Sequence, residues 1–255
     1  MIEYRRGDSV DELRRRVSAV RVEPDPGLLD GLVESGDRVV CVCPIDESAP
    51  KGRLILPQQQ VVRELLDAGA AALVCQPPQL ADLLVRTAGV KFVITDSQAF
   101  GEVRRVVAGR DVRLTSFSIL FARQKGDLAE FLKGVAAVKN LKDGDTVLIA
   151  EGCTHHRQCN DIGAVKIPKA LAKLSGGKKF NFVFSSGATF GLSGRSGIAL
   201  VVHCGGCMLT RREVLRRIDC AKEAGVPIVN YGILLAAASG MTDVSEIGIV
   251  ASSIS

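Results

Sequence analysis

The three histidines of this chain all lie beside clustered cysteines. One segment reads Glu151-Gly-Cys-Thr-His-His156, and the other reads His203-Cys-Gly-Gly-Cys207. Thiolate sulfur and imidazole nitrogen are ligands of zinc sites, and thiolates also hold iron–sulfur clusters. Core packing accounts well for one isolated histidine, but it does not account for every histidine falling in these two segments. The pair of segments therefore predicts a metal centre.

The spacing Cys204-x-x-Cys207 allows two thiolates to bind one metal centre, because the two intervening glycines permit a tight turn. Cys153 supplies a third thiolate from a distant part of the sequence. Both segments follow a predicted strand and precede a predicted helix. Since the carboxyl ends of parallel strands lie on one edge of a sheet, where ligand sites collect, two neighbouring loops would bring the three cysteines together.

Three thiolates can be completed in more than one way. A fourth ligand from His155, His203 or Cys159 would give a closed zinc site of the structural kind. Alternatively, three cysteines would hold a 4Fe–4S cluster and leave one iron for a labile or external ligand. A redox pair formed by Cys204 and Cys207 is a third alternative, although it requires neither the third cysteine nor the histidines. The residues alone leave zinc and iron–sulfur open.

The composition is that of an ordinary globular protein. The 255 residues are 47% hydrophobic and 24% charged, and the formal net charge is +5. The aromatic content is 4% with no tryptophan, so few side chains can stack on bases and we expect no nucleic-acid partner. No apolar run approaches the ~20 residues of a membrane span, and no secretory signal is visible. We therefore expect a cytoplasmic protein with no membrane partner. Four further cysteines are predicted to pack in the core, namely Cys41, Cys43, Cys75 and Cys220.

Near-continuous apolar strands alternate with helical patterns along the chain, which indicates parallel sheets covered by helices. The predicted strands are 38–45, 71–76, 91–95, 113–122, 146–150, 181–184, 198–203 and 227–230. The predicted helices are 58–68, 79–88, 100–108, 127–140, 166–174 and 210–224. We expect an α/β fold of two consecutive units, each with a mainly parallel sheet flanked by helices. No internal repeat is evident in the sequence.

The stretch Ala108–Val112 is the predicted boundary between the two units. Residues 1–25, which run into two prolines, are predicted to be an N-terminal linker. Residues 26–110 form the first unit, and residues 111–255 form the second. The first unit has short apolar strands and too few helices to cover a sheet edge, which predicts a homodimer formed through its own surface. The alternative is that the linker protects that edge.

The two metal-binding segments and several flanking blocks resemble one known family. Cys153-Thr-His155, followed far downstream by His203-Cys204-x-x-Cys207, is similar to the cluster-binding signature of HydF, the FeFe-hydrogenase maturation factor. The flanking blocks that resemble the family are Ala49–Gln60, Phe117–Leu128, Asp161–Pro168, His203–Leu215 and Gly225–Gly232. The resemblance covers roughly residues 30–235.

The resemblance implies a scaffold rather than an enzyme. HydF proteins are dimers that bind a 4Fe–4S cluster through three cysteines, which correspond here to Cys153, Cys204 and Cys207. They carry a precursor of the hydrogenase diiron subcluster, made by two radical-SAM maturases, and deliver it to the apo-FeFe-hydrogenase. His155 and His203 are expected near the cluster, as hydrogen-bonding or exchangeable groups. By this resemblance the first unit is a dimerisation domain and the second is the iron–sulfur cluster-binding domain.

The chain departs from the family in two respects. Family members normally begin with a GTPase domain, and no G-x-x-x-x-G-K-[ST] motif occurs here. Either residues 1–25 are the remnant of an interdomain linker, or the chain is a natural homologue without the GTPase domain; the sequence leaves both open. Cys159 stands where carboxylates are more usual, which leaves the fourth iron ligand open among Cys159, Asp161, a histidine and an exogenous group. The alternative functions are a structural zinc protein that serves interaction and a thiol oxidoreductase, which has less support.

Overall fold

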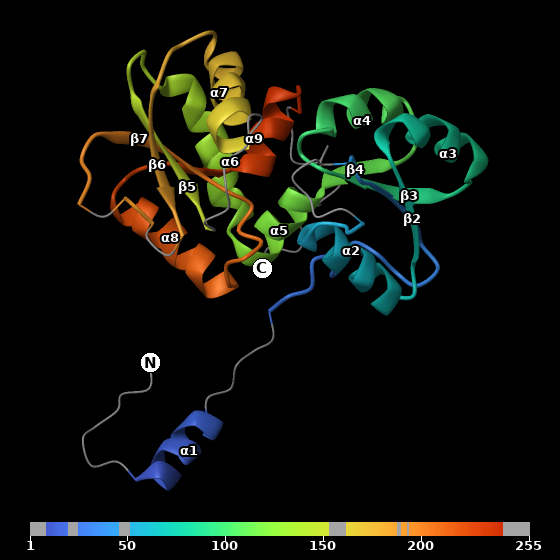
Figure 1. The fold of residues 1–255 in the computed structure, drawn as a ribbon, viewed down its shortest axis with the longest axis horizontal. Helices are drawn as coiled ribbons and strands as arrows, with labels where there is room; N and C mark the ends of the chain where they lie inside the picture. The colour runs from blue at the N-terminus through green and yellow to red at the C-terminus, as the bar shows by residue number, and fades with distance from the viewer. Residues whose placement is uncertain are drawn as a thin grey trace.

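Two four-stranded parallel sheets, each flanked by helices, confirm the predicted α/β class (Figure 1). The structure is a computed structural model, and it describes residues 9–19, 25–45, 52–152, 162–187, 190–192 and 194–241. Among the helices of these ranges, none combines the length and the apolar composition that crossing a bilayer needs. The first sheet has the strand order β2-β1-β3-β4 and the second has the order β6-β5-β7-β8.

The first unit alternates strands and helices as the sequence predicts. Its strands are β1 (Arg38–Val42), β2 (Ala71–Cys75), β3 (Val90–Thr95) and β4 (Arg113–Ser116). Its helices are α2 (Leu56–Asp67), α3 (Leu80–Arg86, after the 3-10 turn Pro77–Gln79) and α4 (Phe100–Val107). The central strands β1 and β3 are almost entirely buried, because helices cover both faces of the sheet, and this explains their continuous apolar sequence.

The second unit repeats this arrangement. Its strands are β5 (Thr146–Glu151), β6 (Asn181–Ser186), β7 (Ile198–His203) and β8 (Ile228–Asn230). Its helices are α6 (Leu128–Ala137, followed by the 3-10 turn Val138–Asn140), α7 (Ile167–Ser175, after the π-helical turn Ile162–Lys166), α8 (Arg211–Glu223) and α9 (Tyr231–Ala238). Alternate residues of β5 face two different apolar cores, because the sheet is covered on both sides.

The expectation of a strand over 113–122 is wrong in its second half. Strand β4 ends at Ser116, and helix α5 (Phe117–Lys125) begins at the next residue. The Ser116 hydroxyl caps this helix by accepting a hydrogen bond from the Ile119 N–H at 3.2 Å. The helix is buried on most sides, so its apolar residues show no helical periodicity. Because β4 pairs with β3, the predicted boundary at residues 110 and 111 also falls too early, before the last strand of the first sheet.

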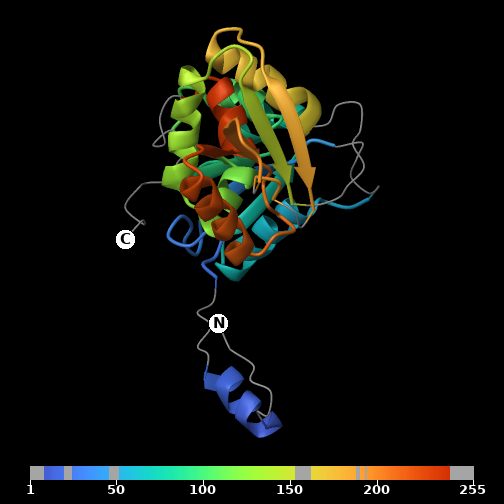
Figure 2. The same cartoon turned by 90° about the vertical axis from the view of Figure 1, so that its left-hand side faces the viewer.

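Two further helices were not predicted. Helix α1 (Val10–Ala19) lies within the segment interpreted as an N-terminal linker, and Figures 1 and 2 show it away from both sheets. Helix α9 (like α5) is apolar on all sides, so its sequence shows no helical periodicity. It begins after Asn230, whose side-chain oxygen accepts a hydrogen bond from the Gly232 N–H at 2.8 Å.

The two units are structural repeats of each other, although no repeat is evident in the sequence. Their strand orders match, and the pairing of the two central strands shifts register at the same place, after Arg38 in one unit and after Thr146 in the other. Each first strand is preceded by a Gly-Asp turn. In these turns Asp37 accepts a hydrogen bond from the Glu34 N–H, and Asp145 accepts one from the Lys142 N–H, each at 2.7 Å.

The last helix of each unit packs against the other unit. Helix α5 follows the first sheet and contacts α8 and α9, while α9 follows the second sheet and contacts α4 and α5. Figure 1 shows both helices between the two sheets. Polar contacts join the units as well: the Arg104 guanidinium donates to the Ser239 carbonyl at 3.3 Å, and the Lys166 ammonium donates to Gln98 Oε1 at 2.6 Å. The carboxyl edge of the second sheet therefore lies close to residues of the first unit.

Candidate metal centre

The Cys204-x-x-Cys207 segment forms the loop between β7 and α8, at the carboxyl edge of the second sheet. Both cysteine side chains are half-buried, and neither forms a disulfide. Gly206 has a φ of +66°, and a Cβ at this position would lie 3.2 Å from a methyl of Val214, so the loop requires glycine there. The loop ends at Thr210, whose hydroxyl caps α8 by accepting from the Glu213 N–H at 3.3 Å.

Gly152, the residue that follows β5, lies next to this segment, as the sequence predicts. Strands β5 and β7 are neighbours, with Ala150 paired to His203. The Cys204 N–H donates to the Ala150 carbonyl at 2.9 Å, and the Gly152 N–H donates to the Cys204 sulfur at 3.1 Å. Gly152 immediately precedes Cys153 in the chain. The two predicted metal-binding segments therefore meet at the Cys204 thiol.

Several predicted ligands lie outside the described residues. These are Cys153, His155, Cys159 and Asp161. Within the ranges that the structure describes, no group of three or more His, Cys, Asp or Glu side chains is placed to hold a metal ion. Two of the three predicted thiolates, Cys204 and Cys207, and one of the two predicted cofactor-binding histidines, His203, lie within the described ranges.

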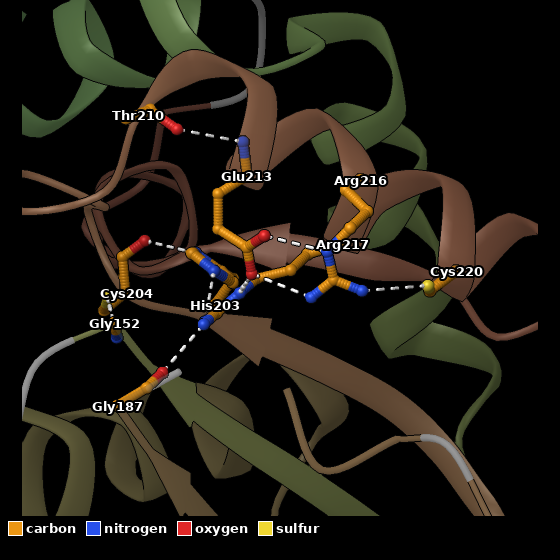
Figure 3. Close-up of polar contacts among 9 residues, drawn as sticks. All are labelled: Gly152, Gly187, His203, Cys204, Thr210, Glu213, Arg216, Arg217 and Cys220. Atoms are coloured by element: carbon orange, nitrogen blue, oxygen red, sulfur yellow. Dashed lines mark hydrogen bonds and ion pairs between the residues drawn. The ribbon is translucent and has the colours of Figure 1, made fainter. Parts of the chain in front are cut away.

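His203 is buried, with 1% of its surface exposed, and both of its ring nitrogens are engaged (Figure 3). Nδ1 lies 2.7 Å from the Cys204 carbonyl oxygen, and Nε2 lies 3.3 Å from a guanidinium nitrogen of Arg217. Because a carbonyl only accepts, Nδ1 carries the proton and Nε2 accepts from Arg217. Burial lowers the pKa of His203 to about 4, so the ring is neutral at pH 7. In this arrangement His203 orients the Cys204 backbone.

Arg217 is a buried residue of the site that the sequence analysis missed. Its guanidinium bonds the Glu213 carboxylate and the Gly187 carbonyl, each at 2.8 Å, and it also lies over the Phe190 ring. Hydrogen bonds from Arg216 and then from Arg217 lower the pKa of Glu213 to about 2, against the effect of burial. Figure 3 shows this network next to Cys204, joining Gly187 after the end of β6 to His203 of β7 and to α8. The signal available in the sequence was that Arg217 falls among the apolar residues Val214, Ile218 and Ala221 on one face of the predicted helix.

Two more polar contacts hold the ends of the neighbouring strands. The Asn230 side-chain amide donates to the Cys204 carbonyl at 3.2 Å, so that this oxygen also receives a bond from the end of β8. The Tyr231 hydroxyl donates to the Glu151 carboxylate at 3.2 Å, and Glu151 is the buried last residue of β5. The Cys204 carbonyl on one side of the Gly152–Cys204 contact and the Glu151 carboxylate on the other are therefore held by side chains.

The donor groups present fit a thiolate-bound metal centre. Cys204 and Cys207 are both half-buried, and the Cys204 sulfur accepts a backbone N–H from Gly152, which is the kind of hydrogen bond that stabilises a thiolate. Neutral His203 adds no charge next to them. These features suit an iron–sulfur cluster and a zinc ion alike, so geometry alone does not choose between them.

Comparison with known protein families gives two matches that together span most of the chain. Residues 28–126 match the model described as the hydrogen maturase F dimerization domain. Residues 129–245 match the model described as the hydrogen maturase F tetramerization domain. The two matches meet between α5 and α6, at the junction of the two structural units. No curated protein matches the sequence.

Proposed function

The chain belongs to the hydrogen maturase F (HydF) family and has a role in hydrogenase maturation, and within that role we propose that it is a scaffold for a 4Fe–4S cluster. In this proposal Cys153, Cys204 and Cys207 hold the cluster at the carboxyl edge of the second sheet. The protein then receives the diiron subcluster precursor from radical-SAM maturases, carries it, and delivers it to apo-FeFe-hydrogenase. The chain itself catalyses no reaction.

One contact supports the proposal most strongly: the hydrogen bond from the Gly152 N–H to the Cys204 sulfur. Gly152 directly precedes Cys153 in the sequence, and in this proposal Cys153 joins Cys204 at one centre. Cys207 lies on the same loop as Cys204, three residues further along. The fold thus supplies a reason why cysteines far apart in the sequence serve one centre.

A site with three cysteines suits a carrier. When bound, a cluster held by three thiolates keeps one iron without a cysteine ligand, and that iron is where a second metal fragment can attach. The residues of the chain hold the thiolates and fix the backbone around them. His203 and Asn230 both bond the Cys204 carbonyl, and the Gly152 N–H donates to the Cys204 sulfur.

The matched dimerization and tetramerization domains support oligomer formation. We propose that the first unit forms the homodimer through strand β2, which is an outer strand of its sheet. Three large apolar side chains of this unit are strongly exposed: Val74 on β2 itself at 49%, Leu66 on α2, which packs against β2, at 61%, and Val85 on α3 at 74%. An outer strand with exposed apolar residues and unpaired backbone groups favours pairing with a second copy.

Anaerobic reconstitution of the full chain tests the cluster assignment. We expect about four irons and four sulfides per chain, with a brown colour and broad visible absorbance. Replacing Cys153, Cys204 or Cys207 by serine should each remove most of the bound iron. Cys220→Ser is the matched control, because Cys220 is also partly buried but lies on α8 beside Arg216, away from the loop.

The metal found decides between the two leading functions. A colourless protein that binds zinc through the same cysteines would favour the structural zinc alternative. A full complement of iron in Cys204→Ser would reject the three-cysteine site. Equal iron loss in Cys220→Ser and the site variants would mean that the loss reflects general instability.

A further inference from the structure

Lys125, the last residue of α5, reaches from the end of the first unit to the cysteine loop of the second. Its ammonium group donates to three backbone carbonyls of that loop: Gly206 at 3.2 Å, Cys207 at 3.0 Å and Leu209 at 2.8 Å. An ammonium has three N–H donors and no acceptor, so these three bonds satisfy it completely. The side chain is half-buried, and its nitrogen lies 5.0 Å from the centre of the Phe121 ring.

The loop that Lys125 holds also touches the chain next to Cys153. The Leu209 side chain packs on Gly152, so closely that a Cβ on Gly152 would lie 2.6 Å from Leu209 Cγ. Lys125 bonds the carbonyl of the same Leu209. A shift of the loop would therefore move the Leu209 side chain, which packs on Gly152, the residue before Cys153.

Helix α5 contacts this region at two other points. Ser118, near its start, lies beside Gly205 of the loop and against Gly232 at the start of α9. Near its end, the Gln124 carbonyl accepts a hydrogen bond from the Arg211 guanidinium at 2.6 Å, and Arg211 is the first residue of α8. The helix is thus fixed to the loop at both ends, so Lys125 occupies a defined position.

We propose that Lys125 is a positioning residue for the metal centre: it fixes the Cys204–Cys207 loop in its binding conformation and sets a positive charge beside the two thiolates. This inference rests on the proposed function for the nature of the bound group, but the loop contacts themselves do not depend on it. Since α5 leads directly out of the first sheet, Lys125 also links the dimerization domain to the cysteine loop.

The test compares Lys125→Met, which removes the charge and all three bonds at similar length, with Lys125→Arg, which keeps the charge and several donors. Lys133→Met is the matched control, because Lys133 lies exposed on α6 and pairs only with Glu130 among the contacts described for it. In the metal-free full chain, hydrogen exchange of residues 204–210 should become about tenfold faster in Lys125→Met, as expected for the loss of charged hydrogen bonds. Lys125→Arg should recover most of this protection.

The second readout is the reduction potential of the reconstituted cluster. A cation near a cluster favours the more negative reduced form, so Lys125→Met should lower the potential while Lys125→Arg and Lys133→Met leave it near the wild-type value. Unchanged loop exchange together with an unchanged potential in a folded Lys125→Met protein would overturn the inference. Faster loop exchange in a protein that binds no iron would support the positioning role and reject the proposed cluster. If Lys125→Met fails to fold, Lys125→Gln, which removes the charge and keeps two N–H donors, takes its place: a lowered potential with faster exchange of residues 204–210 supports the inference, and wild-type exchange with a wild-type potential rejects it.

Discussion

The two units have the same fold but present different chemistry at the same edge. The register of the central strands makes Thr95 of the first unit equivalent to His203 of the second, since each pairs with the corresponding residue of the neighbouring strand. The next residue is Asp96 in one unit and Cys204 in the other. Asp96 accepts a hydrogen bond from the buried Gln58 side chain at 2.8 Å, while Cys204 receives the Gly152 N–H. The fold provides the position, and the side chains decide what is bound there.

The first unit also has cysteines, but the thiol of Cys43 is more deeply buried than those of the second unit's cysteine loop. Cys43 lies at the carboxyl end of β1, where burial and then the charge of Asp96 raise its pKa to about 12. Such a thiol stays protonated and binds metal poorly, because the thiolate is the ligand. The cysteines of the second unit lie on a half-buried loop instead. Among its described residues, the first unit therefore offers no pair of accessible thiols at this edge, as the centre proposed for the second unit requires.

The largest expected effect comes from exchanging the equivalent residues. Cys204→Asp gives the second edge the carboxylate of the first and should remove most of the bound iron, because carboxylate oxygen is a poor substitute for thiolate in an iron–sulfur cluster. Asp96→Cys should add no iron, since the residue three positions later is Ala99. Iron analysis after anaerobic reconstitution measures both. Additional iron in Asp96→Cys would show that the fold alone suffices for a site.

The second-largest expected effect concerns Arg217 of the second unit. Among the described residues it is the only fully buried arginine, so the first unit has no counterpart. Arg217→Met removes a fully buried guanidinium and leaves the Gly187 carbonyl and His203 Nε2 without that donor, which should lower the free energy of unfolding by roughly 1–3 kcal/mol for each group. Arg216→Met, which removes a half-exposed partner of the same Glu213, should cost about 0–1 kcal/mol. Denaturant unfolding of the metal-free chain gives both values. Similar losses in the two variants would mean that burial of Arg217 contributes little.

The outer strand of the first sheet is expected to matter for assembly. Val74→Lys places a charge on the exposed edge of β2 and should shift the dimer toward monomer, with a cost of about 1–3 kcal/mol in association for a charge at an apolar contact. Val10→Lys is the control, since Val10 is 64% exposed on α1, away from the sheets. Light scattering over a concentration series measures the change. A dimer as stable in Val74→Lys as in wild type would place the interface elsewhere.

The smallest effect contrasts one carboxylate from each unit. The pKa of Glu213 is lowered to about 2, so its contribution to stability is present above pH 4.5 and is lost as the pH falls toward 2. Burial raises the pKa of Glu64, so the pH dependence of its contribution to stability is the reverse. Glu64 favours the folded state at low pH, and this stabilisation is lost as the pH rises through the raised pKa. The measurement is the free energy of unfolding between pH 2 and 7. Its decrease toward low pH should be smaller in Glu213→Gln than in wild type, and larger in Glu64→Gln. Changes of the same sign in both variants would contradict these assignments.

The sequence predicts much of this architecture because buried parallel strands are continuous apolar runs separated by helical periods. The prediction fails where a helix is apolar on all sides, at α5 and α9, because the helical period disappears there. The capping side chains of Ser116 and Asn230 are the sequence signals that mark the starts of these two helices. The repeat is invisible in the sequence because the two units share turns and register rather than side chains.

The meeting of the two cysteine segments was predictable, because adjacent parallel strands end at one edge and the loops follow directly. The roles of Arg217 and Lys125 were not, since each depends on partners that only the folded chain brings close. Arg217 bonds Gly187 thirty positions away, and Lys125 bonds a loop more than eighty positions away.

Native mass spectrometry of the full chain, purified without oxygen, tests the central claim most directly. The account predicts that each wild-type chain carries the mass of one 4Fe–4S cluster and that Cys153→Ser and Cys204→Ser lose it, while Cys220→Ser keeps it. A zinc-sized mass on the wild-type chain, or an intact cluster on Cys153→Ser, would contradict the account.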